Sequence, residues 1–261
     1  MVTVDNRILQ DVAAEVAARE EKVSFQDVKA KSRASGTPEV IDVRSVLLGS
    51  GCNVIAAFDR MASDFSDHQN PADFAARVEE LGVAMLSYTV RRGQFATALQ
   101  DIQDIRLAVT LPLLLDDLIV DPYQIHEARV LGADALPLAV WAMDQHKLES
   151  LLDRTEALGM TALVEVRNPD EARRAVAAGA SVVAVDVTGY HGSHTLPEAF
   201  AGICEVLPKD TVRLVLGGCW TPRELMAYAR HSADAIYVPH NPLAATKSLV
   251  SAGMHPACPS R

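Results

Sequence analysis

Short apolar runs recur along this chain at a nearly constant spacing. Four of them follow a small residue that ends a helical segment; these residues, Gly82, Gly132, Gly179 and Ser232, are 50, 47 and 53 residues apart. Glycine suits this position because it tolerates the left-handed conformation that closes a helix at its C-terminus. Four more apolar runs lie between these strands, at residues 53–58, 111–115, 161–166 and 213–216.

Eight apolar runs at intervals of roughly 25 residues, with helical segments between them, predict repeated βα units. The runs are apolar almost throughout, which is typical of parallel strands covered by helices on the outside. The sequence therefore predicts an α/β protein with a closed (β/α)8 TIM barrel. An open, doubly wound parallel sheet is the alternative.

The first 52 residues do not fit the eightfold repeat. Ile8, Leu9, Val12, Ala13 and Val16 form a helical apolar stripe. We expect residues 1–52 to be a helical extension that packs on or near the barrel mouth, either as plain packing or as a partial lid. Residues 53–254 would form the barrel and residues 255–261 a C-terminal tail.

Composition narrows the possible partners. The formal charge of -10 disfavours nucleic acid and anionic membranes. No apolar run reaches the ~18 residues of a membrane-spanning helix, and the N-terminus does not resemble a signal peptide. The four cysteines are far apart in the sequence, which favours reduced thiols in the cytoplasm. We expect a cytoplasmic protein with a small-molecule partner; the sequence does not predict an oligomeric state.

Chemistry in such barrels takes place at the C-terminal ends of the strands. The residues at these ends are Asp59, Tyr88, Thr89, Asp116, Asp117, Trp141, Glu165, Asp186, Gly217, Gly218 and His240, and the loop at 187–195 adds His191 and His194. Five of them are carboxylates and none is a lysine. Crowded carboxylates raise one another's pKa, which suits acid/base catalysis.

Other interpretations of this ring stay open. The carboxylates could bind a divalent cation or hold an amine, or they could form ion pairs with arginines such as Arg60, Arg91 and Arg92. Trp141 is a candidate for stacking on an aromatic ligand. We assign candidate catalytic roles to Glu165, Asp59, Asp116 and Asp186. The candidate substrate contacts are Trp141, Tyr88, Asp117, His191, His240, Gly217 and Gly218, with no cofactor expected.

Several segments resemble indole-3-glycerol phosphate synthases, and together they cover nearly the whole chain. They are Arg7-Ile8-Leu9, Val54-Ile55-Ala56, residues 111–124, Gly132-Ala133-Asp134-Ala135 and residues 158–166. The resemblance implies a TIM barrel that closes an indole ring by dehydration and decarboxylation of a phosphorylated anthranilate derivative. In that family two lysines and glutamates transfer protons, while backbone amides and a serine hold the phosphate. Glu165 matches one family glutamate.

The sequence departs from the family at the remaining functional positions. The family glutamate and lysine of the first strand are Ala57 and Asp59, and the lysine of the third strand is Asp116. The later departures from family motifs are Asp186-Val187-Thr188, Leu216-Gly217-Gly218 and Pro239-His240-Asn241. Acids in place of two cations oppose a phosphate ligand, because a unit charge at 4 Å contributes about 4 kcal/mol at an effective dielectric near 20.

We therefore expect a lyase or cyclase of a specialised biosynthetic pathway that acts on an unphosphorylated, neutral or cationic small molecule. Three alternatives remain: a non-catalytic scaffold or regulatory relative, a divalent-metal-dependent enzyme, and a retained synthase. Fold alone does not decide among them.

Overall fold

Eight parallel strands form a closed barrel in the computed structural model, which describes residues 4–62, 70–91, 93–239 and 241–259. The strands pair in sequence order, and β8 pairs with β1 to close the barrel. Their bounds are β1 (Asn53–Phe58), β2 (Met85–Thr89), β3 (Leu113–Asp116), β4 (Ala135–Ala139), β5 (Thr161–Val166), β6 (Val182–Asp186), β7 (Val212–Leu216) and β8 (Ala235–Val238). The predicted (β/α)8 barrel is thus confirmed, and the open sheet was the wrong alternative.

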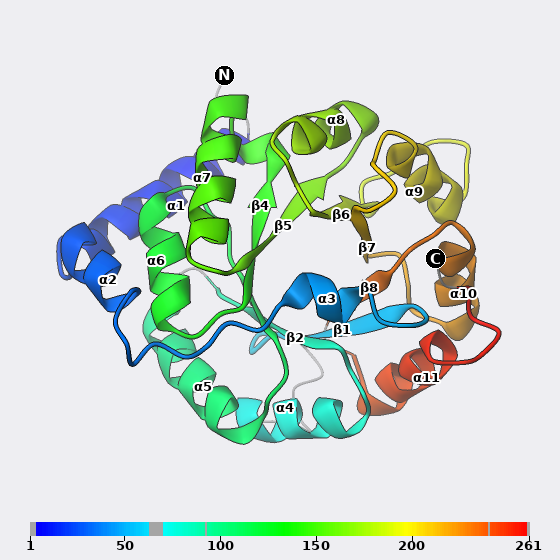
Figure 1. Cartoon of the computed structure of the whole chain (residues 1–261), viewed down its shortest axis with the longest axis horizontal. Coiled ribbons are helices and arrows are strands. Elements are labelled where there is room, and N and C mark those ends of the chain that lie inside the picture. The colour runs from blue at the N-terminus through cyan, green and yellow to red at the C-terminus, as the bar shows by residue number, and fades with distance from the viewer. Residues whose placement is uncertain (1–3, 63–69, 92, 240, 260–261) are drawn as a thin grey trace.

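Helices form a ring around this barrel (Figure 1). They are α4 (Pro71–Glu80), α5 (Phe95–Ala108), α6 (Pro122–Val130), α7 (Gln145–Ala157), α8 (Pro169–Ala177), α9 (Leu196–Cys204), α10 (Pro222–Arg230) and α11 (Leu243–Gly253), with a short 3-10 helix, η2 (Val140–Ala142), after β4. Among the described residues, no helix has both the length and the apolar character to cross a bilayer.

The small residues of the repeat end four of these helices in the left-handed region. Gly82, Gly132 and Gly179 have φ of 84°, 82° and 88°. Ser232 takes the same position with φ of 65°, where a side chain costs about 1–2 kcal/mol. The next residues then enter β2, β4, β6 and β8, so the repeat marks the turn from helix to strand.

Side chains alternate between the barrel interior and the layer beneath the helices. Ile55, Met85, Leu114, Leu163 and Ala184 belong to the interior cluster. The next inward position lies two residues further along each strand. On β3, β5 and β6 these next positions are Asp116, Glu165 and Asp186, so the strands direct the three carboxyl groups into the mouth.

The three N-terminal helices are α1 (Val4–Glu20), α2 (Phe25–Lys31) and α3 (Val43–Leu47). α3 lies across the N-terminal end of the barrel, where Val43 and Leu47 pack into the interior cluster (Figure 1). The sequence did not anticipate that position, which is opposite the mouth. α1 and α2 pack against α6 and the β3–α6 loop through an apolar cluster of Val12, Val16, Val28, Val120 and Tyr123. The division at residue 52 into extension and barrel stays a prediction.

Candidate active site

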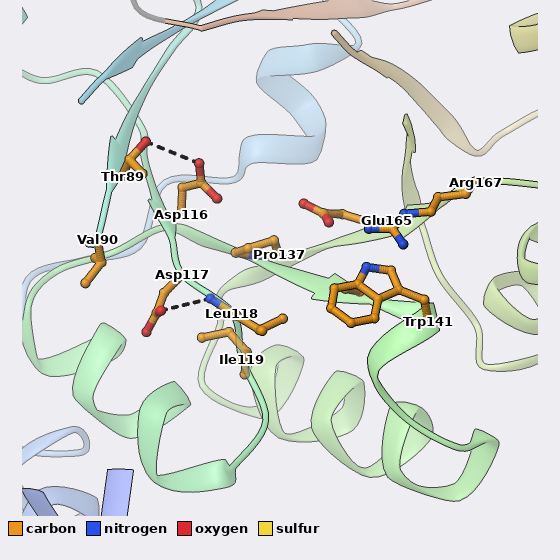
Figure 2. A pocket seen from close by; sticks show the side chains of 11 residues that line it. Thr89, Val90, Asp116, Asp117, Leu118, Ile119, Pro137, Trp141, Glu165 and Arg167 are labelled. Carbon is orange, nitrogen blue, oxygen red and sulfur yellow. Dashed lines mark hydrogen bonds between the residues drawn. The ribbon is translucent and has the colours of Figure 1, made fainter. Parts of the chain in front are cut away.

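Two adjoining cavities open at the C-terminal ends of the strands. The β2–β5 cavity, of about 260 Å³, is lined by Thr89, Val90, Asp116, Asp117, Leu118, Ile119, Pro137, Ala139, Trp141, Glu165 and Arg167 (Figure 2). The β3–β8 cavity, of about 270 Å³, is lined by Leu114, Asp116, Pro137, Leu163, Glu165, Ala184, Asp186, Thr188, Leu216, Gly217, Tyr237 and Pro239. Asp116, Pro137 and Glu165 line both cavities and therefore form their boundary.

Glu165 lies at this boundary and has a strongly perturbed carboxyl group. Burial raises the pKa of its carboxyl group to about 8, and the charges of Asp116 and Asp186 add to the rise while Arg167 opposes it. Among the described residues, none donates a hydrogen bond to this carboxyl group. A carboxyl group with these properties holds a proton at neutral pH and can deliver it to a ligand.

Asp116 has two hydroxyl partners at one of its oxygens. Tyr237 donates to Oδ2 at 2.9 Å, and Thr89 donates to the same oxygen at 3.4 Å. Burial raises the pKa of Asp116, whereas these two hydrogen bonds lower it; nearby Asp59 raises it and Arg91 lowers it. The Oδ1 atom has no hydrogen-bond partner among the described residues, so it is open to a ligand.

The Tyr237→Phe substitution should raise the pKa of Asp116 further. It keeps the ring and removes one of the two donors that stabilise the carboxylate. A carboxyl ¹³C NMR titration would measure the shift. Tyr190→Phe is the matched control, because the Tyr190 hydroxyl accepts from the His194 amide in the β6–α9 loop. An unchanged or lower pKa for Asp116 in Tyr237→Phe would contradict this role of the hydroxyl.

Two of the carboxylates at the mouth have arginine partners. Arg91 forms an ion pair with Asp59, and the Arg167 Nε atom is 3.5 Å from Asp186 Oδ2. The negative charge that the sequence predicted at the mouth is therefore largely neutralised at Asp59 and Asp186. It remains at Asp116, which accepts hydrogen bonds from the hydroxyl groups of Tyr237 and Thr89. Asp59 is also absent from the lining of both cavities, so the structure does not bring it together with the other three acids there.

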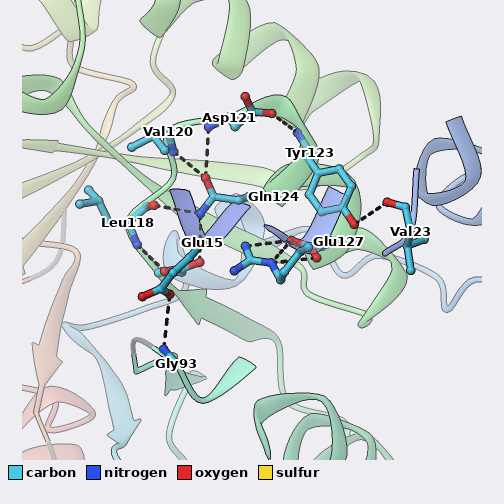
Figure 3. Close-up of polar contacts among 11 residues, drawn as sticks. Glu15, Val23, Gly93, Leu118, Val120, Asp121, Tyr123, Gln124 and Glu127 are labelled. Carbon is cyan, nitrogen blue, oxygen red and sulfur yellow. Dashed lines mark hydrogen bonds and ion pairs between the residues drawn. The ribbon is translucent and has the colours of Figure 1, made fainter. Parts of the chain in front are cut away.

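Asp117 forms its hydrogen bonds with the β3–α6 loop, where Gln124 bonds to Leu118 and Val120 (Figure 3). It accepts from Gln124 Nε2 at 3.1 Å and from the Leu118 amide at 2.8 Å. Burial raises its pKa to about 6 despite these bonds. The expected arginine partner is not Arg60, which pairs with Asp101, nor Arg91; Arg92 lies outside the described residues. Asp117 lines the β2–β5 cavity but also holds its loop in place.

Tyr88 requires a correction. It lies on the outward face of β2, stacked on Phe58 with ring centroids 5.6 Å apart. Its hydroxyl donates to Asp101 at 2.5 Å. Because side chains alternate along a strand, the inward positions on β2 are Ser87 and Thr89, and Thr89 is the residue that lines the cavity. Tyr88 is therefore not positioned to contact a substrate.

Of the other predicted substrate contacts, some line the two cavities and others do not. Gly217 lines the β3–β8 cavity, and both Gly217 and Gly218 have positive φ, at 74° and 68°. His191 is exposed in the β6–α9 loop. His240 lies outside the described residues. Trp141 lines the β2–β5 cavity as predicted.

Sequence reasoning missed Arg167 and Tyr237. The Arg167 guanidinium carbon lies 4.6 Å from the centroid of the Trp141 ring (Figure 2). Tyr237 supplies the shorter of the two hydrogen bonds to Asp116. Strand alternation was the available signal, since Arg167 is two residues beyond Glu165 and Tyr237 is two residues before Pro239. Across the residues described, no group of three or more His, Cys, Asp or Glu side chains is arranged to hold a metal ion.

Comparison with known proteins agrees with this geometry. The family model for indole-3-glycerol phosphate synthase matches residues 5–247. The chain belongs to the indole-3-glycerol phosphate synthase family. Synthases from Mycolicibacterium vanbaalenii and Mycobacterium ulcerans are both 41% identical to it, and each alignment covers 98% of this chain and 97% of the relative. The resemblance recognised in the sequence is thus confirmed, and the protein has a lyase barrel of this family's type.

Solved structures support the fold alone. Thiamine phosphate pyrophosphorylase from Pyrococcus furiosus superposes with a TM-score of 0.61 at 14% identity, over 82% of this chain and all of that one. Identity this low says nothing about the reaction of this family member.

Proposed function

We propose that this protein is a lyase of the indole-3-glycerol phosphate synthase family in which Glu165 transfers the proton. The supporting observation is that its carboxyl group, with a pKa raised to about 8 by burial, lines both cavities together with Asp116. A protonated carboxylic acid at neutral pH suits the departure of a hydroxyl or carboxyl-derived group, because it neutralises developing negative charge.

The residues at the mouth favour an unphosphorylated substrate. A phosphate site requires free backbone N–H groups and positive potential. Here Pro239 lines the β3–β8 cavity and has no N–H to donate, while Asp116 adds an acid to the same wall. Arg91 and Arg167 are already close to Asp59 and Asp186. A neutral ligand, or one with a positive group, fits this balance better than a dianion.

Retention of the family reaction is the second candidate. The 41% identity to named synthases over nearly the whole chain favours it more than it favours a new reaction. Glu165, which matches a glutamate of the family, favours it as well. Arg91 and Arg167 would then have to supply the positive charge that the family's lysines supply, from different positions.

A matched pair of ligands separates the two candidates. The family substrate and its dephosphorylated form would be compared by calorimetric binding and by ultraviolet detection of indole formation. The primary proposal predicts that the phosphate does not increase affinity and that the phosphorylated compound is not converted. Indole formation from the phosphorylated compound, together with affinity at least about tenfold higher than for the dephosphorylated form, would instead establish the retained synthase.

A further inference from the structure

Asp116 and Arg167 present opposite charges on two sides of the β2–β5 cavity, with Glu165 between them (Figure 2). Asp116 lies on β3, and Arg167 follows β5. One strand, β4, separates them, so they lie two strand spacings apart, each about 4.8 Å. The cavity therefore has a negative end and a positive end.

Each of these groups keeps atoms free for a ligand. Asp116 Oδ1 has no hydrogen-bond partner among the described residues. The Arg167 Nε atom is 3.5 Å from Asp186 Oδ2, and no described residue accepts a hydrogen bond from the Nη atoms. The Arg167 side chain is 45% exposed, and its flat face rests on Trp141. Because a guanidinium has five donors in one plane, these free nitrogens suit a planar carboxylate.

Besides Glu165, the cavity has an apolar part of its wall. Leu118, Ile119 and Pro137 form this part together with the ring of Trp141. A ligand that spans the cavity would place a flat hydrocarbon body against these side chains. An α-amino acid does not fit this pattern, because its two charged groups are attached to the same carbon.

We propose that the β2–β5 cavity binds a zwitterion with an aromatic body, whose ammonium group contacts Asp116 and whose carboxylate contacts Arg167. This inference rests on the proposed function, because it specifies the unphosphorylated substrate of that same site. It also explains why Arg167 and Asp116 coexist at the mouth: the net charge of such a ligand is zero, and each end meets an opposite charge. The Arg167 end could pair with a dianionic phosphate, but Asp116 at the other end would repel it.

Five ligands with one ring test the inference by calorimetry. 4-(Aminomethyl)benzoate carries both charges, 4-methylbenzylamine only the positive one, 4-methylbenzoate only the negative one, 4-methylbenzyl alcohol neither, and 4-methylbenzyl phosphate a dianion. We expect the zwitterion to bind about tenfold more tightly than either singly charged ligand, because each charge adds a charge-assisted hydrogen bond.

Two variants test which residue binds each charged end of the ligand. Arg167→Gln should reduce the affinity for the zwitterion to that for the amine, and Asp116→Asn should reduce it to that for 4-methylbenzoate. The controls are Arg173→Gln and Asp170→Asn, which alter an exposed ion pair on α8 outside both cavities. Thermal melting of each variant without ligand would verify folding.

Three results would overturn the inference: tightest binding of the phosphate ester, equal binding of the zwitterion and the alcohol, or no binding of any probe. None of them depends on turnover. An NMR titration of Glu165 reports on the proposed function separately. If Glu165 has a pKa near 8 but the ligand panel fails, only the proposed zwitterionic ligand is rejected. If the panel succeeds but the pKa of Glu165 is ordinary, only the proposed role of Glu165 as proton donor is rejected.

Discussion

The Asp134→Ala variant should lose about 3 to 5 kcal/mol of its free energy of unfolding, the largest stability effect that we expect from one substitution. Asp134 is 1% exposed, yet its carboxylate has three donors. Oδ1 accepts from the Ile41 amide at 2.8 Å, and Oδ2 accepts from the Leu113 amide at 2.8 Å and pairs with Arg106. Alanine would leave all three donors without their acceptor, which is costly for buried groups.

These contacts connect parts of the chain that are far apart in sequence. Arg106 extends from α5 and also donates to the carbonyl oxygens of Gly132 and Leu111. Leu113 begins β3, and Ile41 leads into α3 at the N-terminal end of the barrel. Losing Asp134 should therefore weaken the attachment of α3 and the start of β3 together.

Urea unfolding followed by fluorescence and circular dichroism would measure the change. Asp153→Ala is the matched control, because Asp153 is exposed on α7 and its hydrogen bonds do not join separate elements. Asp134→Asn should fall between the two, since an amide offers one acceptor oxygen in place of two. A loss in Asp134→Ala no larger than that in Asp153→Ala would show that the three bonds contribute little.

The fold could be predicted because its determinants are local and repeated. Four of the eight βα units end their helix at Gly82, Gly132, Gly179 or Ser232, and the backbone conformation there follows from the residue type and its position. Asp134 and Asp234 occupy the same place in two copies of the repeat. Each carboxylate accepts a hydrogen bond from a backbone amide near the start of the preceding strand. The donor is the Leu113 amide for Asp134 and the Arg213 amide for Asp234. A repeat in the sequence thus corresponds to a repeat of hydrogen bonds.

The site was predicted less completely because it depends on the direction of side chains. Glu165, Asp116 and Asp186 were found, since each occupies the last inward position of its strand. Tyr88 was chosen for its place near a strand end, although it is one residue out of phase. Arg167 was missed because it lies just beyond β5, where the inward phase continues into the loop.

Partners across loops were predicted only in part. The sequence offered Arg91 as one of several arginines that could pair with the acids, but its pairing with Asp59 depends on the path of the chain after β2, for which the residue pattern gives no rule. The same holds for α3, whose five residues carry no sign of the end of the barrel that they cover. Because the pairing of Asp59 with Arg91 was not assigned, the negative charge of the mouth was overestimated from the sequence.

The Glu165→Gln substitution should lower kcat/KM by about 10²–10⁴-fold for the ligand of the matched pair that is converted. Glutamine keeps the size of the side chain and removes the proton that the acid delivers. Burial, with further contributions from Asp116 and Asp186, raises the pKa of this carboxyl group to about 8. Activity of the parent protein should therefore fall as pH rises through about 8, and the variant's residual activity should lack this dependence.

The same substitution changes how stability depends on pH, which can be measured without a substrate. Between the ordinary glutamate value of 4.5 and about 8, the folded protein holds a proton at Glu165 that the unfolded chain has released. Because the unfolded chain binds fewer protons, this carboxyl group makes stability decrease as pH rises through that window. Glu165→Gln removes the decrease, so the variant should gain stability relative to the parent at about pH 9 compared with about pH 5. Glu80→Gln, at an exposed position on α4, should show no such gain. Equal pH dependence in the parent and in Glu165→Gln would mean that Glu165 titrates as an ordinary carboxyl group, and its proposed role as the proton donor would then be lost.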